Sequence, residues 1–231
     1  MRLTYYGHSC FSVTVNNKNL LFDPFITGND LAKNIDINTI EADYILLSHG
    51  HSDHVADAES IAKRTGATII AAYEVAMWFA AKGIEKYHPM NTGGKWAFDF
   101  GTVKCVNAIH SSSMPDGAYG GNPMGFMILN DEQNFYYSGD TALTLDMQLV
   151  PLFAEIDFAL LPIGDNFTMD AEDAVQAAKM VQTKMVIGLH YDTFGLIKID
   201  HQKAVDLFKM NGLELKLPAI GETTEITADT D

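Results

Sequence analysis

The chain has 231 residues, of which 47% are hydrophobic and 19% charged, values typical of a globular protein with a sizeable core. It carries 30 acidic and 15 basic residues, a formal charge of −15 at pH 7. Nucleic-acid and anionic-membrane surfaces need clustered Lys and Arg, so this balance argues against both kinds of partner. We expect a small-molecule substrate, and an anionic one stays open because bound metal ions can reverse the local field.

The N-terminus is too polar for a secretory signal, and no later apolar run approaches a membrane span, which predicts a cytoplasmic protein. Cys10 and Cys105 are interpreted as reduced core thiols, with a disulfide as the alternative. The length predicts one domain over residues 1–231 and leaves a homo-oligomer open.

The chain is strand-rich at its start and alternates between strands and helices at its end. Strands are expected at residues 2–6, 11–15, 19–23, 44–48 and 68–72, and helices at 56–64 and 73–83. Hairpins are expected over 95–109 and 124–138. In the last third of the chain, the sequence pattern predicts strand 157–161, helix 170–182, strand 185–189, helix 200–210 and strand 213–217. The tail from Glu222 either adds one short edge strand or frays.

A weak internal repeat relates the two halves of the chain. EADYILLSHGHSDH (41–54) aligns without gaps on EIDFALLPIGDNFT (155–168), with five matches. Each copy follows an aspartate at a predicted strand end, Asp23 before the first copy and Asp140 before the second. We therefore expect two halves related by a pseudo-twofold, with two sheets packed face to face and helices outside.

The segment LLSHGHSDHVAD (46–57) places four metal-binding side chains within six positions, directly after an apolar run. His49 and His51 are two residues apart and can point the same way, while Gly50 lets the backbone turn tightly. Asp53 and His54 lie at the turn into the next helix and cannot easily share that direction. Four protein ligands would close a single zinc site, whereas a catalytic zinc keeps a position open. The alternative interpretation is a polar surface loop.

Three further donors lie just past predicted strand ends: His110, Asp140 and His190. Seven donors are too many for one ion and suit two ions, which can hold a hydroxide between them. The predicted partition gives His49, His51 and His110 to one ion and Asp53, His54 and His190 to the other, with Asp140 bridging.

HGHSDH fits the HxHxDH signature of the metallo-β-lactamase superfamily, and the three later donors follow in that family's order. YGHSCF, MNTGGKWAFDFG, AIHSSS and HYDTF resemble the small bacterial metal-dependent hydrolases, a branch similar to L-ascorbate 6-phosphate lactonases. The resemblance covers essentially the whole chain and implies an α+β fold, an αββα sandwich of two mixed sheets. It also implies two divalent ions, most often zinc, with manganese or iron as alternatives. Asp192 and Gly195 depart from the pattern of the branch.

We predict a metal-dependent hydrolase that attacks a small ester, lactone or phosphodiester with a metal-bridged hydroxide, with Asp53, Asp140 and His8 as catalytic residues. Diiron relatives that reduce oxygen usually have a carboxylate at the position of His51, so a histidine there favours hydrolysis. The alternatives are a non-hydrolytic iron-binding or redox module and an empty, degenerate site.

Several other residues keep two interpretations. His8 either closes a hairpin or lies near the metals and protonates a leaving group. Asp23 is either a turn residue before Pro24 or a carboxylate that fixes the tautomer of a ligand histidine. The remaining candidates for the pocket, each with a loop role as the alternative, are Asp165, Ser111, Ser112, Ser113, Tyr191 and Thr193. His201 is expected at the surface.

Overall fold

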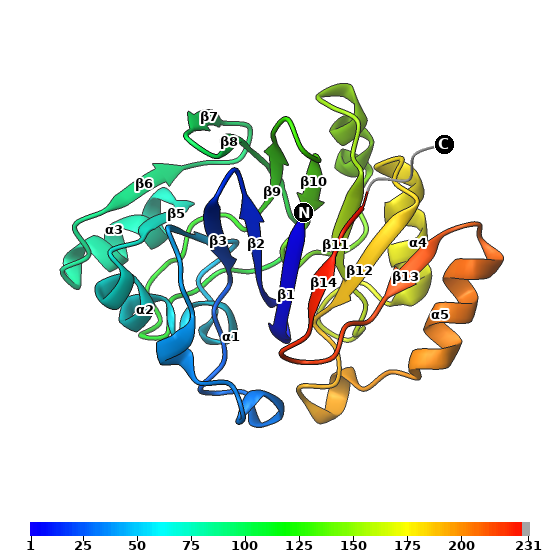
Figure 1. The fold of residues 1–231 in the computed structure, drawn as a ribbon, viewed down its shortest axis with the longest axis horizontal. Helices are drawn as coiled ribbons and strands as arrows, with labels where there is room; N and C mark the ends of the chain where they lie inside the picture. Colours follow the sequence, from blue (N-terminus) through cyan, green and yellow to red (C-terminus); the bar gives the residue numbers. More distant parts are fainter. Residues whose placement is uncertain (228–231) are drawn as a thin grey trace.

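A computed structural model describes residues 1–227 and shows two seven-stranded sheets with helices on their outer faces (Figure 1). Helices α1 to α3 lie on the side of the first sheet, and α4 and α5 on the side of the second. The predicted α+β class and αββα layering are confirmed.

The first sheet is built from both ends of the chain. Its order is β14-β1-β2-β3-β4-β5-β6. The pairs from β14 to β3 are antiparallel and those from β3 to β6 are parallel. The strands are β1 (Arg2–Gly7), β2 (Cys10–Val15), β3 (Lys18–Phe22), β4 (Tyr44–Leu47), β5 (Thr68–Ala72), β6 (Tyr87–Met90) and β14 (Thr223–Glu225).

The second sheet repeats this pattern of pairing. Its order is β13-β12-β11-β10-β9-β8-β7. The pairs from β7 to β10 are antiparallel and those from β10 to β13 are parallel. The strands are β7 (Lys95–Phe98), β8 (Gly101–Asn107), β9 (Met124–Leu129), β10 (Phe135–Tyr137), β11 (Phe158–Pro162), β12 (Met185–Leu189) and β13 (Glu214–Lys216). The two aligned sequence segments contain β4 and β11, which hold equivalent places, so the expected relation between the halves is present in the topology.

Local sequence signals set the ends of the helices, which are α1 (Ser52–Val55), α2 (Ala58–Thr65), α3 (Tyr73–Ala81), α4 (Ala171–Met180) and α5 (His201–Met210). The carboxylates of Asp170 and Asp200 cap α4 and α5 by accepting from backbone N–H groups three residues on. Gly66 ends α2 in the left-handed conformation, with a φ of 73°.

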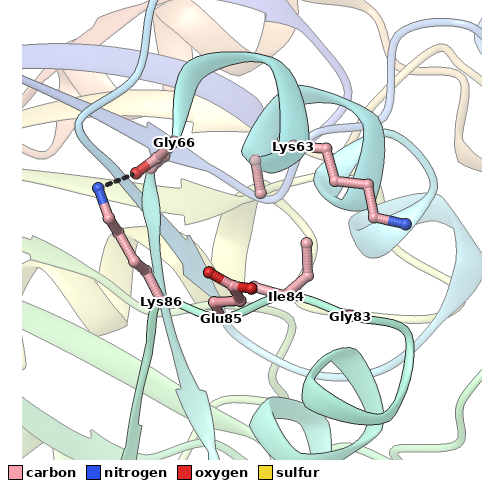
Figure 2. A pocket seen from close by; sticks show the side chains of 8 residues that line it. Lys63, Gly66, Gly83, Ile84, Glu85 and Lys86 are labelled. Carbon is pink, nitrogen blue, oxygen red and sulfur yellow. Dashed lines mark hydrogen bonds between the residues drawn. The ribbon is translucent and has the colours of Figure 1, made fainter.

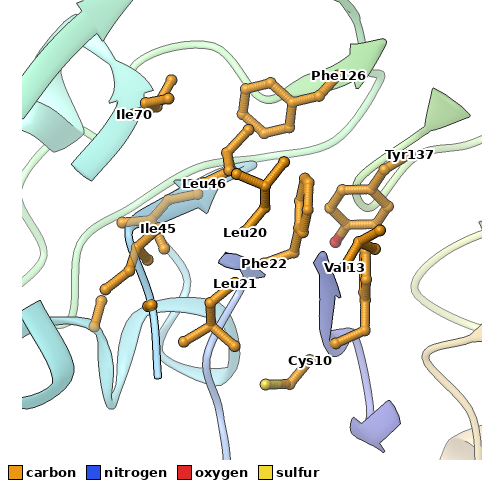
Figure 3. Close-up of a cluster of buried hydrophobic side chains, with 14 of the residues drawn as sticks. Cys10, Val13, Leu20, Leu21, Phe22, Ile45, Leu46, Ile70, Phe126 and Tyr137 are labelled. Carbon is orange, nitrogen blue, oxygen red and sulfur yellow. The ribbon is translucent and has the colours of Figure 1, made fainter. Parts of the chain in front are cut away.

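The interior of the sandwich is apolar and largely aromatic (Figure 3). Phe11 stacks on Phe22 with 4.5 Å between ring centroids, and the Tyr137 ring packs edge-on against both. Along β11 the side chains alternate, so that Leu160 points into the sandwich while Leu161 packs with residues of α4 and α5. Burying each large side chain contributes about 1.5–3 kcal/mol. The strand ends are therefore held rigidly from both faces.

The structure differs from the predicted elements in three places. Strand β6 was not predicted because it contains Pro89, which is tolerated at the edge of a sheet. The helix expected at 56–64 is α2, and a short additional helix, α1, precedes it where a turn was expected. A 3₁₀ helix, η3 (Leu145–Leu152), was not expected. The edge strand predicted in the tail is β14, and the last predicted residues, 228–231, lie outside the described part of the chain.

Three shorter 3₁₀ turns complete the described elements: Asp30–Ala32, Ile37–Thr39 and Gly195–Ile197. Both cysteines are buried and unpaired. None of the described helices has the length and apolar character needed to cross a bilayer.

Candidate metal centre

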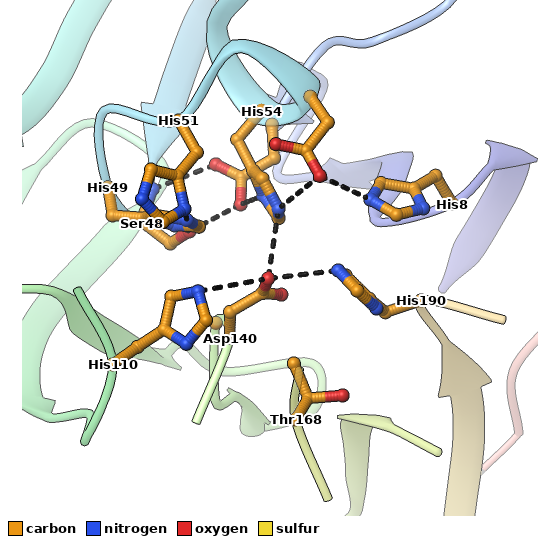
Figure 4. Close-up of polar contacts among 12 residues, drawn as sticks. His8, Ser48, His49, His51, His54, His110, Asp140, Thr168 and His190 are labelled. Carbon is orange, nitrogen blue, oxygen red and sulfur yellow. Dashed lines mark hydrogen bonds and ion pairs between the residues drawn. The ribbon is translucent and has the colours of Figure 1, made fainter. Parts of the chain in front are cut away.

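The predicted donors converge at one edge of the two sheets (Figure 4). The donors His49 and His51 lie in the loop after β4, and Asp53 and His54 lie in α1, which follows directly. The remaining three lie in loops after the ends of β8, β10 and β12, at His110, Asp140 and His190. Strands β8, β10 and β12 run in the same direction, so their carboxyl ends lie at the same edge of the second sheet, which brings these distant segments together.

Within the described part of the chain, three groups of residues have candidate ligand atoms within 4.8 Å of one another. The first group is His49, His51 and His110, and the second is His8, Asp53, His54 and His190. The third, Asp23, His49 and His54, contains one donor of each of the first two groups. The structure thus gathers the residues in the predicted partition and adds His8 to the second group.

Asp140 lies between the first two groups. Its Oδ2 atom is 3.0 Å from Nε2 of His190, 3.2 Å from Nε2 of His54 and 3.7 Å from Nε2 of His110. One carboxylate oxygen therefore faces rings of both groups, which is the placement expected of a bridging ligand.

The buried polar atoms at this centre fit a bound cation. Among the described residues, four buried side-chain polar atoms make no hydrogen bond, and three of them belong to His54, Asp140 and His190. His54 Nε2 has the Asp140 carboxylate beside it, at 3.2 Å, as an ion-pair contact. Buried polar atoms nearly always have a partner. Imidazole nitrogen with carboxylate oxygen is a donor set that suits zinc, iron and other divalent transition metals. The residues present therefore fit a metal centre.

Burial prepares most of the histidines for metal binding. It lowers the pKa of His49 well below its usual value and lowers the pKa of His51 and of His110 in the same direction. These three rings are neutral at pH 7, and the neutral imidazole is the form that binds a metal.

His54 and Asp140 behave as a charged pair. Burial alone would lower the pKa of His54, but the carboxylates of Asp140 and Asp23 outweigh it and raise this pKa well above its usual value. Burial alone would raise the pKa of Asp140, but His190 and His54 outweigh it and lower this pKa well below the usual range. In the metal-free chain a proton on His54 therefore faces Asp140, in the place that a cation would take, and metal binding would release it.

Asp23 is fully buried and accepts four hydrogen bonds. Its carboxylate accepts from the Ser48 backbone N–H at 2.8 Å, the Ser48 hydroxyl, the Tyr137 hydroxyl at 2.6 Å and His54 Nδ1 at 2.8 Å. With Nδ1 as the donor, Nε2 of His54 is the atom left for a ligand. The structure thus favours the role of Asp23 in fixing a tautomer. Ser48 and Tyr137 were not identified from sequence because neither residue carries a motif of its own.

His8 lies behind Asp53 and does not line the pocket. Its Nε2 is 3.2 Å from Asp53 Oδ2, and its Nδ1 is 3.0 Å from the Thr193 hydroxyl. Burial lowers the pKa of His8 to about 4, so the ring is neutral. A carboxylate can only accept, so Nε2 donates to Asp53 and Nδ1 accepts from Thr193. His8 also has a left-handed backbone, with a φ of 56°, a strain found most often at functional sites.

A pocket of about 640 Å³ opens over the centre. The donors on its floor are His51, Asp53, His110, Asp140 and His190, and its other lining residues are Ser111, Phe167, Phe194, Gly195 and Leu196. The three apolar side chains were not identified from sequence, because an isolated Phe or Leu in a loop resembles any other surface residue.

Of the other predicted pocket residues, Ser111 lines this pocket, with its hydroxyl 3.3 Å from His51 Nε2, and the rest lie elsewhere. Ser112 instead accepts from the Gly50 N–H, and Ser113 forms a β-bridge, so both brace the loop. Asp165 lines a neighbouring groove.

Tyr191 is buried and stacks on Tyr5, so it is not a wall of the pocket. His201 is exposed, as expected, but its Nε2 lies 2.6 Å from Asp192 Oδ2.

A second hollow lies between α2 and the segment before β6 (Figure 2). Its ionic side chains are Lys63, Glu85 and Lys86, and the Lys86 ammonium donates to the Gly66 carbonyl at 3.1 Å. No histidine lines it among residues 1–227, so it shares no ligand with the metal centre.

Comparison with known proteins agrees with this geometry. A model of the beta-lactamase superfamily domain matches residues 2–190. The chain is 54% identical over 226 residues to a UPF0173 metal-dependent hydrolase of Flavobacterium johnsoniae, covering 98% of this chain and 100% of the relative. It is 42% identical over 231 residues to the UPF0173 metal-dependent hydrolase YtkL of Bacillus subtilis, with coverages of 98% and 100%. Igni18, a metallo hydrolase of Ignicoccus hospitalis, superposes with a TM-score of 0.87 at 33% identity, covering 98% of this chain and 99% of that one.

The paired sheets and the cluster of histidines and aspartates at their edge define a metallo-β-lactamase fold with a metal-dependent site. The matching residues and the relatives narrow this class further. The chain belongs to the metallo-β-lactamase superfamily and, within it, to the UPF0173 metal-dependent hydrolases. The predicted family is confirmed, while the similarity to L-ascorbate 6-phosphate lactonases stays a prediction.

Proposed function

We propose that the chain hydrolyses a small ester, lactone or phosphodiester at a centre of two divalent ions. The observation that carries this proposal is the position of Asp140, whose Oδ2 atom faces His110 of one group and His54 and His190 of the other. His49, His51 and His110 would hold one ion, and Asp53, His54 and His190 the other, with Asp140 shared. When bound, such a pair supplies a hydroxide nucleophile at neutral pH and positive charge beside the developing oxyanion.

The residues of the chain itself orient this centre. Asp140 is held as an anion by His190 and His54, which keep its pKa low against the effect of burial. Asp23 holds the His54 ring with Nδ1 as donor. Hydrogen-bond partners of this kind, which orient the metal ligands, commonly contribute 10–100-fold, or about 1.4–2.8 kcal/mol, to metal affinity or activity.

His8 acts as a positioning residue in this proposal. Its neutral ring links the Thr193 hydroxyl to the Asp53 carboxylate, which fixes the direction in which Asp53 presents its other oxygen. Because His8 is buried and absent from the pocket lining, this role fits the structure better than protonation of a leaving group.

The metal content gives a direct test of the centre. The donor set favours zinc, with manganese and iron as alternatives. We expect two ions per chain by atomic emission after expression and purification without chelators. A coloured, iron-loaded preparation that consumes oxygen and hydrolyses nothing would favour the redox alternative.

Replacing the shared carboxylate tests the proposed chemistry. We expect Asp140→Ala to lower hydrolysis of bis-p-nitrophenyl phosphate, of p-nitrophenyl esters or of lactones by at least about 100-fold, because effects on ligand-orienting partners alone reach that size. The far-ultraviolet circular dichroism should be unchanged. Asp146→Ala, an exposed aspartate that bonds Asn107, is the matched control. Full activity of Asp140→Ala would reject the proposal.

A further inference from the structure

Three large apolar side chains surround the mouth of the pocket and stay in solvent. The exposed fractions are 50% for Phe167, 38% for Phe194 and 70% for Leu196. They come from two loops, one after β11 and one after β12, that meet at this opening. Exposed apolar groups gathered around a concave site mark a binding surface, because folding gains little from them. We call these three side chains the apolar rim.

The first loop holds Phe167 in a fixed position. The loop turns through Asp165 and Asn166, whose φ values of 63° and 55° are left-handed. The Asp165 N–H donates to the Met169 carbonyl at 3.0 Å, and the Met169 N–H donates to the Thr141 carbonyl at 3.1 Å. The exposure of Phe167 is therefore imposed by a braced turn.

The second loop is anchored by Asp192. Its backbone N–H donates to the Ile197 carbonyl at 2.8 Å, and its carboxylate accepts from the Ile199 N–H at 3.1 Å and faces His201 Nε2 at 2.6 Å. This anchor closes the loop that carries Phe194 and Leu196. The Phe194 ring packs edge-on against His8, with 5.3 Å between ring centroids, so the rim continues down to the centre.

The pocket offers no cationic side chain to a second charged group of a substrate. Within residues 1–227, no Lys or Arg lines it. Lys198 and Lys203 line the groove beyond Leu196, but four acidic residues line that groove too, namely Asp165, Asp170, Glu172 and Asp200. A metal pair would attract the reacting group itself. Apart from the Ser111 hydroxyl, a phosphate elsewhere on the substrate would meet the apolar side chains of the wall.

We infer that the pocket selects an ester or lactone whose group next to the scissile bond is apolar and uncharged, and that Phe167, Phe194 and Leu196 determine this specificity. The inference rests on the proposed hydrolytic function. It narrows the substrate class to apolar esters and lactones and excludes phosphorylated sugar lactones. The reaction adds water across the acyl C–O bond, so that the acyl carbon gains the hydroxyl and the alcohol oxygen leaves with the proton.

Binding to the metal-free protein tests the rim without any catalysis. The neutral probe N-phenyl-1-naphthylamine fluoresces when it enters an apolar site. We expect Phe194→Ser and Leu196→Ser each to weaken its binding by at least about fivefold, since burying two CH₂ groups already corresponds to more than that. Leu152→Ser is the matched control, because Leu152 is 76% exposed on η3 and does not line the pocket. Equal binding by rim and control variants, or no binding by the wild type, would overturn the inference.

Hydrolysis by the zinc-loaded protein tests the substrate class. For p-nitrophenyl acetate, butyrate and hexanoate, kcat/KM should rise by up to about fourfold per CH₂ group. A lactone bearing a phosphate should react more slowly than its unphosphorylated counterpart. A flat series, or preference for the phosphorylated lactone, would overturn the inference. Failure with every substrate would reject the proposed function, and the binding experiment would still decide whether the rim is an apolar site.

Gly195 allows the charge of the rim to be changed. A Cβ atom built there meets nothing within 4 Å, so a longer side chain fits without displacing the loop. Gly195→Lys should raise kcat/KM for the phosphorylated lactone relative to hexanoate by up to about fivefold, the effect of about 1 kcal/mol from one added charge pair. Gly195→Gln, similar in length and uncharged, should not. An unchanged ratio in Gly195→Lys would overturn the inference.

Discussion

The loops after β4 and β11 hold equivalent places in the two sheets, yet they contribute opposite kinds of side chain. Both carry a glycine that their surroundings require. A Cβ atom on Gly50 would lie 2.5 Å from Met114 Sδ, and one on Gly164 would lie 2.0 Å from the His190 carbonyl oxygen. Beyond the glycine the loops diverge, so that Asp53, which faces the centre, occupies the position of Phe167 on the rim.

This difference separates two tasks between these two loops. The loop after β4 presents metal donors, and the loop after β11 presents an apolar contact for the substrate. Phe167 and the donors of HGHSDH lie on different loops, each backed by its own sheet, so a change at Phe167 should leave those donors intact. Phe194 and Leu196 instead share the loop after β12 with the donor His190. Substrate preference should therefore be separable from metal binding at Phe167.

The largest expected effect comes from replacing Asp53 and Phe167, the two equivalent positions, each by alanine. Asp53→Ala should lower kcat by at least about 100-fold for every substrate, because it removes a candidate ligand whose orienting partners alone would account for about that factor. Phe167→Ala should change only KM, by about fivefold, and only for substrates with an apolar arm. Steady-state kinetics on the ester series checks both. A loss of kcat in Phe167→Ala would contradict the division of tasks.

A second comparison sets two buried aspartates of the first half against each other. Asp23 bonds His54, whereas Asp57 bonds only backbone and hydroxyl groups of Ile26 and Thr27. Both substitutions to Asn should lower the free energy of unfolding, because each weakens hydrogen bonds to a buried charge. Asp23→Asn should also weaken metal affinity by about 10–100-fold, by freeing the His54 tautomer. Competition with a chromophoric chelator measures this, and an equal loss in Asp57→Asn would remove the special role of Asp23.

The donors were predictable from sequence because their chemistry and spacing are local. The motif HGHSDH places four candidate donors within six positions. Each later donor follows a strand that is recognisable in the sequence as an apolar run. The two sheets were likewise predictable from the runs and from the weak repeat, since the two copies really do contain the equivalent strands β4 and β11.

The surroundings of the donors were not predictable, because they depend on contacts between segments far apart in the chain. Tyr137 reaches Asp23 across 114 residues, and Thr193 reaches His8 across 185. Neither contact leaves a pattern in its own neighbourhood. The rim was missed for the same reason, since Phe167 and Leu196 acquire a shared function only when two loops meet.

The two glycines give a smaller effect, on stability. Gly164→Ala places a methyl group against the His190 carbonyl and should lower the free energy of unfolding by about 1–3 kcal/mol, the usual cost of overpacking. Gly50→Ala should lower the free energy of unfolding by a similar amount. That result would show that the two loops share a backbone conformation that leaves no room for a side chain at the glycine. Gly195→Ala is the control, as its added Cβ meets nothing within 4 Å. Urea unfolding measures all three, and an unaffected Gly164→Ala would mean that the loop shifts freely.

The smallest expected effect concerns the connection between the loops. Thr193 belongs to the loop after β12, and its hydroxyl fixes His8, which in turn holds Asp53 on the donor side. Thr193→Val keeps the shape and removes one hydrogen bond of about 1 kcal/mol, so kcat should fall about fivefold. KM should stay unchanged, because the hydroxyl touches His8 and does not line the pocket. Thr4→Val, which removes an exposed hydroxyl pair with Thr223, is the control. A change in KM for apolar esters, with kcat constant, would instead indicate that Thr193 contributes to substrate binding, as the apolar rim does.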